Sequence, residues 1–176
     1  MTTDTSTAPD FRLPSVTGGE VALSDLGGTP ALLVAFLCNH CPYVRHVESA
    51  LGRFAAEALP RGLTTLAISV NDILSHPDDD PAHMAEQAAR AGFGFPYLYD
   101  ESQDVARAYG AVCTPDLFLY DADRRLAYRG QFDDTRPGAG REATGNTLRA
   151  AVDLVLAGRP VPEPHPASVG CSIKWR

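Results

Sequence analysis

The sequence predicts an α/β domain in which helices flank a central mixed β-sheet. Two apolar runs, residues 31–37 and 63–70, predict strands, and the uncharged first run is typical of a strand that is buried on both faces. The first run is followed by a segment with the apolar periodicity of a helix, and the second run is followed, after a charged loop, by an alanine-rich helix; this alternation is typical of an α/β fold. A strand, a turn and a second strand over residues 116–130 then predict an antiparallel hairpin, which makes the sheet a mixed one.

Each predicted element follows from local signals in the sequence. The first helix begins at Pro42, where a missing N–H costs nothing, and its apolar residues recur at helical spacing. The charged segment 71–80 is expected to be a solvated acidic loop. The other expected elements are a β-hairpin (11–14 and 21–23), a helix (81–91), a short strand (97–99), a helix (100–109), the strands of the closing hairpin (116–120 and 125–130) and a last helix (141–157).

Composition divides the chain into three parts. Residues 1–8 are polar and rich in threonine, so we expect them to be disordered. Residues 9–158 carry all the predicted helices and strands and form the domain. Residues 159–176 are rich in proline and are expected to form an irregular tail that packs on the domain, with Ile173 and Trp175 as anchors.

The composition also limits the classes of function and partner. The chain has 176 residues, which suits one domain. Its net charge of −7 argues against a nucleic-acid or anionic-membrane partner, and no apolar run approaches the roughly 20 residues of a membrane helix. The N-terminal residues lack the features of a secretory signal, so we expect a cytoplasmic protein. We also expect a monomer or homodimer with no cofactor and no bound metal. In that reducing compartment, four cysteines indicate catalysis or metal binding rather than structural disulfides.

A Cys-x-x-Cys motif lies between the first buried strand and the first helix, and it reads Cys38-Asn39-His40-Cys41. Unpaired backbone N–H groups and the helix dipole stabilise a thiolate at such a junction. The spacing lets Cys38 lie exposed at the helix N-terminus with Cys41 one turn inside, so Cys38 is the predicted nucleophile and Cys41 the resolving thiol. His40, when protonated, is expected to lower the pKa of a neighbouring thiol. A structural zinc site is the alternative, but it needs a second pair of ligands, and the other two cysteines are isolated in the sequence.

Further segments form a pattern with this motif. Thr114-Pro115 precedes the predicted strand 116–120, and the other segments are 8–14, 23–28, 36–44, 95–100, 113–116 and 170–175. Together they resemble the thioredoxin superfamily and, more closely, the redoxins of the alkyl hydroperoxide reductase and thiol-specific antioxidant type. Within these, the chain is similar to a peroxiredoxin-like subgroup that carries Cys-x-x-Cys. The resemblance implies a thioredoxin-like fold, oxidoreductase activity and a cis-proline at Pro115, whose backbone edge faces the cysteine pair and receives the substrate.

The chain departs from the peroxiredoxin pattern at the groups that position a peroxide. Peroxiredoxins carry Pro-x-x-x-Thr/Ser-x-x-Cys; with Cys41 as the peroxide-reacting cysteine, Cys38 replaces the Thr and Val34 replaces the Pro. Residues 114–116 stand where peroxiredoxins have an arginine. Loss of these hydrogen-bonding groups raises the barrier by roughly a few kcal/mol, which disfavours peroxide reduction.

We therefore expect thiol–disulfide exchange with a protein or small-molecule disulfide and a thiol electron donor. There are two alternatives. One is a thiol peroxidase that acts through Cys41, and the other is a metal-binding or redox-sensing module.

The two isolated cysteines each have two interpretations. Cys113 precedes the expected cis-proline and is either an additional redox thiol or a small buried residue. Cys171 lies on the tail and is either a resolving cysteine that reaches back to the pair or part of a packed terminus. Thioredoxins also carry a buried carboxylate on the strand before the motif. Residues 31–37 offer none, so Glu48 or a water is expected to substitute. The histidines and aspartates of residues 76–83 could bind a metal, but a solvated acidic turn at a helix N-terminus is the simpler interpretation.

Overall fold

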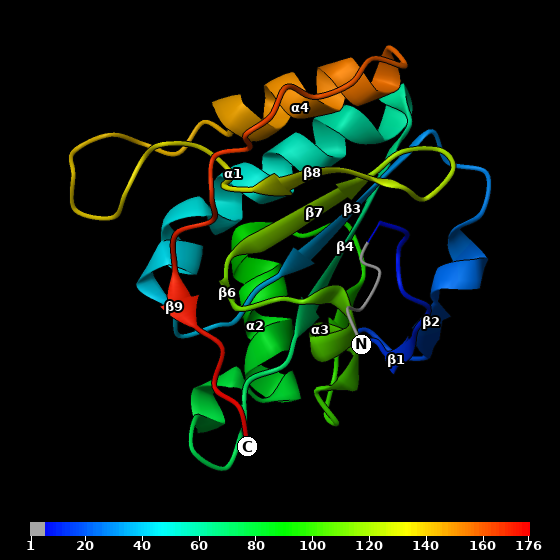
Figure 1. The fold of residues 1–176 in the computed structure, drawn as a ribbon. Helices are drawn as coiled ribbons and strands as arrows, with labels where there is room; N and C mark the ends of the chain where they lie inside the picture. The colour runs from blue at the N-terminus through cyan, green and yellow to red at the C-terminus, as the bar shows by residue number, and fades with distance from the viewer. Residues whose placement is uncertain (1–5) are drawn as a thin grey trace.

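A five-stranded mixed sheet in the order β5-β4-β3-β7-β8 organises the fold (Figure 1). The computed structural model describes residues 6–176. β3 is the central strand; it pairs in parallel with β4 and antiparallel with β7, and all six of its residues are buried, which explains its uncharged sequence. The strands of this sheet are β3 (Ala31–Phe36), β4 (Leu63–Ser69), β5 (Tyr97–Tyr99), β7 (Asp116–Tyr120) and β8 (Leu126–Gly130).

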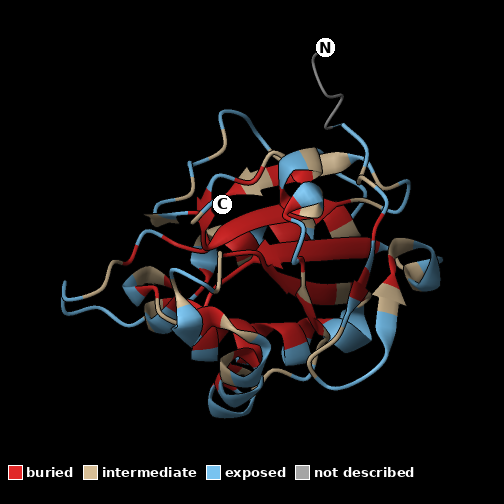
Figure 2. Ribbon diagram, turned by 90° about the horizontal axis from the view of Figure 1, so that it is seen from below, coloured by how far each residue is buried: buried red, intermediate tan, exposed pale blue. Residues whose placement is uncertain are grey.

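Helices and an N-terminal hairpin cover the two faces of the sheet. α1, α2 and α4 contribute buried residues to the core on one face, whereas α3 and the hairpin β1–β2 pack on the other. Figure 2 shows that the buried residues concentrate in the sheet and on the inner sides of the helices. Among residues 6–176, no helix is long and apolar enough to cross a bilayer. The elements are α1 (Pro42–Ala58), α2 (Pro81–Ala91), α3 (Asp104–Tyr109), α4 (Asn146–Leu156), β1 (Arg12–Pro14), β2 (Glu20–Ala22) and three 3-10 turns, η1 (Leu23–Leu26), η2 (Leu59–Arg61) and η3 (Pro77–Asp79).

The predicted fold class is confirmed, but two helices are shorter than expected. α4 begins at Asn146 instead of residue 141, because the Asp133 carboxylate accepts the backbone N–H groups of Thr144 and Gly145, at 2.7 and 2.9 Å, and holds them outside the helix. α3 begins at residue 104 instead of 100, because Gln103 has a left-handed backbone conformation. Periodicity alone does not report such local hydrogen bonds.

Both ends of the chain are more ordered than composition indicates. The expected disorder of residues 1–8 is wrong for Ser6–Ala8: Ala8 donates its N–H to the Arg124 carbonyl at 2.9 Å, and Ser6 accepts the N–H of Leu126. Residues 1–5 lie outside the described residues. The tail is not wholly irregular, because β9 (Cys171–Ser172) pairs antiparallel with β6 (Cys113–Thr114).

Candidate redox site

The cysteine motif lies where the central strand ends and α1 begins. Backbone pairing continues to Leu37, whose N–H donates to the Ile68 carbonyl. Cys41 is the N-cap of α1, and Pro42 occupies its first turn. The side chains of Cys38 and Cys41 are both fully buried. The prediction that Cys38 lies exposed is therefore wrong, because segments distant in the sequence cover it.

The loop before β7 covers the two sulfurs. The Thr114–Pro115 peptide bond is cis, as the resemblance implies. The Thr114 hydroxyl lies 3.3 Å from the Cys38 Sγ, and the Thr114 carbonyl oxygen lies 3.4 Å from the Cys41 Sγ. The thiols of Cys38 and Cys41 also hydrogen-bond to each other. The two cysteines thus meet against one residue of the loop, an arrangement suited to dithiol chemistry.

Asp79, in η3, is a buried carboxylate at the site, which corrects the expectation that this segment is wholly solvated. It is 0% exposed. Its oxygens accept the backbone N–H groups of Asn39 and His40 at 2.8 and 3.0 Å and the Asn71 side-chain amide at 3.0 Å, and one also bonds to the His40 Nδ1. A carboxylate oxygen lies within 4.8 Å of the Cys38 Sγ. Asp79 therefore fixes the loop between the cysteines and supplies the carboxylate missing from β3.

The sequence holds a weak signal for Asp79. Three consecutive aspartates, residues 78–80, precede α2, whereas an N-cap needs only one of them. Asp80 is that cap and accepts the His83 N–H at 2.9 Å. Asp78 is exposed, as expected of a solvated acidic turn. The middle aspartate is thus the one available to turn inward.

Glu48, the residue expected to supply the carboxylate, is buried but does not touch a sulfur. It pairs with the Arg90 guanidinium at 2.8 Å and accepts the Gln87 side-chain amide at 3.0 Å. Gln87 also donates to the Cys38 carbonyl at 3.0 Å and accepts the Tyr97 hydroxyl at 2.8 Å. Glu48 therefore supports the backbone of Cys38 through Gln87.

The C-terminal tail crosses the site as β9. Its pairing with β6 aligns Cys171 with Thr114 and Ser172 with Cys113. The Cys171 Sγ lies 2.9 Å from the Cys41 Sγ, and Cys171 is partly exposed. The tail therefore reaches the cysteine pair. The backbone edge before Pro115, the expected meeting point with substrate, is occupied by the protein's own chain.

Interactions among the sulfurs shift the pKa values of Cys38 and Cys41 in opposite directions. The bond with Cys38 lowers the pKa of Cys41 to about 4 against the effect of burial, with further contributions from Cys171 and the backbone of Val44. The same bond, burial and the charge of Asp79 raise the pKa of Cys38. Burial and the bond with Cys41 raise the pKa of Cys171 to about 11. The sequence predicts that Cys38 is the nucleophile, whereas the lowered pKa lies on Cys41; the assignment of the nucleophile stays a prediction.

Cys113 fits the interpretation as a small buried residue. It is 9% exposed, and its Sγ lies 3.7 Å from the Pro115 carbonyl oxygen. Burial, foremost, raises the pKa of Cys113 to about 12, which disfavours the thiolate form at neutral pH. Its additional redox role stays a prediction.

Among residues 6–176, Cys38, His40 and Asp79 form a group that could hold a metal ion. One potential ligand atom from each lies within 4.8 Å of the others. However, both oxygens of Asp79 already accept hydrogen bonds from the protein, and a structural zinc site uses four ligands. The group therefore fits a metal only in part.

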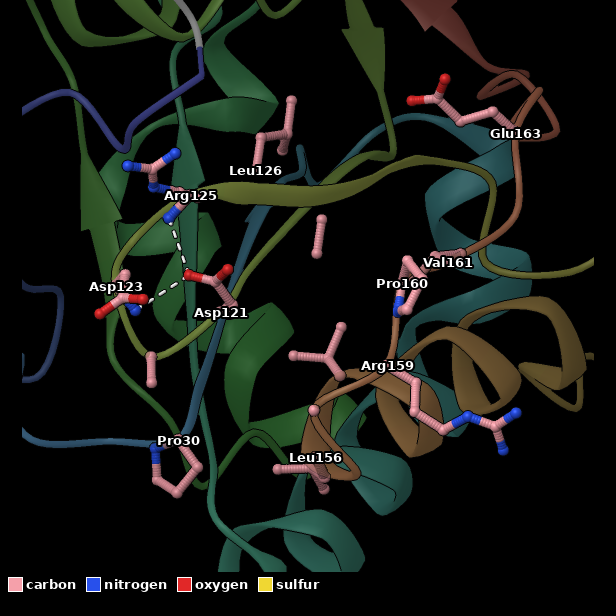
Figure 3. A pocket seen from close by; sticks show the side chains of 14 residues that line it. Pro30, Asp121, Asp123, Arg125, Leu126, Leu156, Arg159, Pro160, Val161 and Glu163 are labelled. Atoms are coloured by element: carbon pink, nitrogen blue, oxygen red, sulfur yellow. Dashed lines mark hydrogen bonds between the residues drawn. The ribbon is translucent and has the colours of Figure 1, made fainter.

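A pocket at the other end of the sheet is separate from the cysteines (Figure 3). Pro30 lies on one side of it, and the turn that begins at Asp121 lies on another. The Asp121 carboxylate accepts the backbone N–H groups of Asp123 and Arg125, so it is occupied in shaping the turn. Because Pro30 precedes β3 and the motif follows it, the pocket takes no part in the candidate site.

Comparison with known proteins identifies the family. The model of the AhpC/TSA family matches residues 5–129, which include the Cys-x-x-Cys motif and the cis-proline. The chain belongs to the AhpC/TSA family. Two solved structures are similar to this AhpC/TSA protein at 48% identity over 97% of the chain. One is a hypothetical protein from Sinorhizobium meliloti 1021, with a TM-score of 0.94 over 93% of its chain. The other is an uncharacterized conserved protein from Geobacillus kaustophilus, with a TM-score of 0.92 over 90% of its chain.

Similar proteins with named activities are more distant. The thiol-disulfide oxidoreductase ResA of Geobacillus thermodenitrificans is 28% identical over 127 residues, or 69% of this chain, and the chain spans 65% of that relative's length. A putative thiol:disulfide interchange protein DsbE from Chlorobium tepidum shares the fold, with a TM-score of 0.68 at 22% identity over 86% of this chain and 96% of its own. This AhpC/TSA protein is therefore a redoxin of thioredoxin-like fold, similar to proteins named as thiol–disulfide oxidoreductases.

Proposed function

We propose that this AhpC/TSA protein is a thiol–disulfide oxidoreductase in which Cys38 and Cys41 interconvert between dithiol and disulfide. The observation that carries the proposal is the meeting of both sulfurs at Thr114, beside the cis-proline, with a lowered pKa on one of them. One thiolate and one neighbouring thiol are the two parts that disulfide exchange requires. The substrate is a protein or small-molecule disulfide, and a thiol donor returns the pair to the reduced state.

The electrostatics of the pair support Cys41 as the nucleophile. Its thiolate attacks one sulfur of a disulfide, the S–S bond breaks, and a thiolate leaves. Cys38 then attacks the Cys41 Sγ, passing its proton to the nearby Asp79 carboxylate, and the second thiolate leaves. His40 bonds to Asp79 and its side chain is 28% exposed, so it connects the carboxylate to solvent. One disulfide is thereby reduced to two thiols as the Cys38–Cys41 disulfide forms.

Single serine substitutions test these roles in an insulin-reduction assay. Cys41→Ser removes turnover because no low-pKa thiol remains. Cys38→Ser permits one reaction per chain and leaves Cys41 trapped in a disulfide, which mass spectrometry detects. The opposite pattern would assign the nucleophile to Cys38. Equal residual turnover in both variants would overturn the dithiol mechanism itself.

A thiol peroxidase is the second candidate, because the family resemblance places Cys41 at the peroxide-reacting position and the pKa of Cys41 is lowered. The groups around it do not favour this reaction. Arg129 donates to Asp116 and to the Gly110 carbonyl, and the Thr114 hydroxyl lies on Cys38. A stopped-flow measurement of peroxide consumption distinguishes the two candidates, since a peroxidase reacts orders of magnitude faster than a free thiol.

A metal-binding or redox-sensing module is the candidate outside enzymes, and the grouping of Cys38, His40 and Asp79 favours it. Metal analysis of protein purified under reducing conditions tests this candidate. A stoichiometric ion that is lost in Cys38→Ser would support it over disulfide exchange. Protein that reduces insulin without a bound ion would support the enzyme.

A further inference from the structure

We propose that Cys171 is a shuttle cysteine that carries a disulfide from solvent to Cys41. The inference rests on the proposed thiol–disulfide activity and supplies the route by which a substrate reaches a buried pair. Cys38 and Cys41 are both 0% exposed, so an external disulfide cannot touch either sulfur in this conformation. Cys171 is partly exposed, and its Sγ lies 2.9 Å from the Cys41 Sγ. The three sulfurs thus form a chain that leads from the surface to the interior.

The tail is fastened on both sides of Cys171. After it, Ile173 donates its N–H to the Val112 carbonyl at 3.1 Å, and Lys174 donates its N–H to the Asn71 side chain at 2.9 Å. Before it, the Ser168 hydroxyl donates to the buried Asp116 carboxylate at 2.9 Å, a second attachment to the sheet. A segment held in this way does not behave as a loose cover that a substrate lifts. Exchange through Cys171, with the tail still attached to the domain, is a simpler route than removal of the tail from the site.

Gly170 shows how closely the tail approaches the cis-proline loop. A Cβ at this position would lie 2.0 Å from the Thr114 carbonyl oxygen, which is also the oxygen that contacts the Cys41 Sγ. Any larger residue at position 170 therefore moves the tail away from the loop. The position of Cys171 depends on this contact, and the contact can be removed without changing a cysteine.

The proposed sequence of steps balances in atoms and electrons. Cys171 attacks a disulfide RSSR′ as its proton passes to the Cys41 thiolate; Cys171–S–SR forms and R′S⁻ leaves, taking that proton. The Cys41 thiolate then attacks the Cys171 Sγ, the Cys41–Cys171 bond forms, and RS⁻ leaves. Finally Cys38 attacks the Cys41 Sγ and loses its proton, and Cys171 leaves and takes up that proton to become a thiol again. In sum, the two cysteines of the pair are oxidised, RSSR′ is reduced to the thiol R′SH and the thiolate RS⁻, and Cys171 is regenerated.

The test measures the reaction of the reduced full-length chain with a chromogenic nitrobenzoate disulfide. In Cys171→Ser, which keeps Cys41 covered, the first release of nitrobenzoate thiol is expected to be slower by about tenfold or more, because access to the thiolate limits exchange. Gly170→Ala should slow it similarly although every cysteine is present. Its matched control is Gly94→Ala, since a Cβ there has no atom within 4 Å. Unchanged rates in both Cys171→Ser and Gly170→Ala would overturn the shuttle.

A second control moves the thiol by one residue. Neighbouring side chains of a strand point to opposite sides, so Cys171→Ser combined with Ser172→Cys keeps a thiol on the tail but turns it away from Cys41. The double variant should stay as slow as Cys171→Ser. Recovery of the wild-type rate would mean that any thiol on the tail suffices, which contradicts a built relay.

Trapping identifies the intermediate. In Cys38→Ser, the last step is blocked, so each chain should release two nitrobenzoate thiols and retain a Cys41–Cys171 disulfide in non-reducing peptide maps. A nitrobenzoate group left on Cys41 would mean direct attack and would refute the shuttle while leaving the proposed function intact. Turnover that survives Cys41→Ser would instead refute the proposed function, so the two failures are distinguishable.

Discussion

The buried carboxylate of Asp79 should be a large contributor to stability, and Asp79→Ala measures it. The substitution removes the acceptor of three N–H donors, of which the Asn39 backbone and the Asn71 amide belong to residues only 4% and 2% exposed. Each buried donor left without a partner costs about 1–3 kcal/mol. Two such donors give a loss of roughly 2–6 kcal/mol, a large part of the roughly 5–15 kcal/mol by which domains are stable.

Urea unfolding followed by circular dichroism is the assay, with Asp78→Ala as the control. The Asp78 side chain is 74% exposed one residue away, so its loss should leave the midpoint unchanged. If Asp79→Ala and Asp78→Ala unfold at the same urea concentration, the inferred role of the carboxylate is incorrect.

Three further predictions concern the thiolate, a charged pair and a helix contact. Since the pKa of Cys41 is lowered to about 4, thiolate absorbance should persist from neutral pH down to about pH 5 and disappear below the pKa, and Cys41→Ser should abolish this titration. Arg90→Ala leaves the Glu48 charge buried without its partner, and because the Arg90 side chain is itself 39% exposed, the expected loss of stability is about 1–3 kcal/mol. As a control, Arg61→Ala removes one member of an exposed ion pair and should change the unfolding midpoint little. Gly52→Ala should destabilise the protein by about 1–3 kcal/mol in thermal unfolding, because a Cβ would lie 2.6 Å from a backbone oxygen of α2. This loss should exceed the gain from the better helix propensity of alanine, and a raised melting temperature would contradict the contact.

Local patterns in the sequence were sufficient for much of the fold. α2 and β5 have the bounds that the sequence predicts, because a proline at a helix start and a turn after its end are local signals. The buried central strand follows from a run without charges. The cis-proline loop follows from the family resemblance together with the position of Thr114-Pro115.

The details of the site depend on contacts between distant segments, and these lie beyond local patterns. Asp79 and Cys171 reach the motif through η3 and β9, which have no periodic signal of their own. The burial of Cys38 depends on segments distant in the sequence, and the pKa of Cys41 is lowered first by Cys38 and then by Cys171, so the spacing of the motif alone reports neither. In similar sequences, two signs are worth looking for. One is an additional aspartate next to the N-cap of a helix, as Asp79 is here, and the other is a cysteine that follows a glycine packed against the cis-proline loop, as Cys171 does here.

The separation of the three sulfurs along the chain gives the redox state a mechanical consequence. Cys41 and Cys171 are 130 residues apart, so a bond between them would close almost the whole domain into a ring, whereas a bond within the motif closes only a turn. By the loss of chain entropy in the unfolded state, the first ring is worth about 5 kcal/mol and the second about 2 kcal/mol. Movement of the disulfide from the tail to the motif would therefore lower the melting temperature, and calorimetry alone could follow which cysteines are joined.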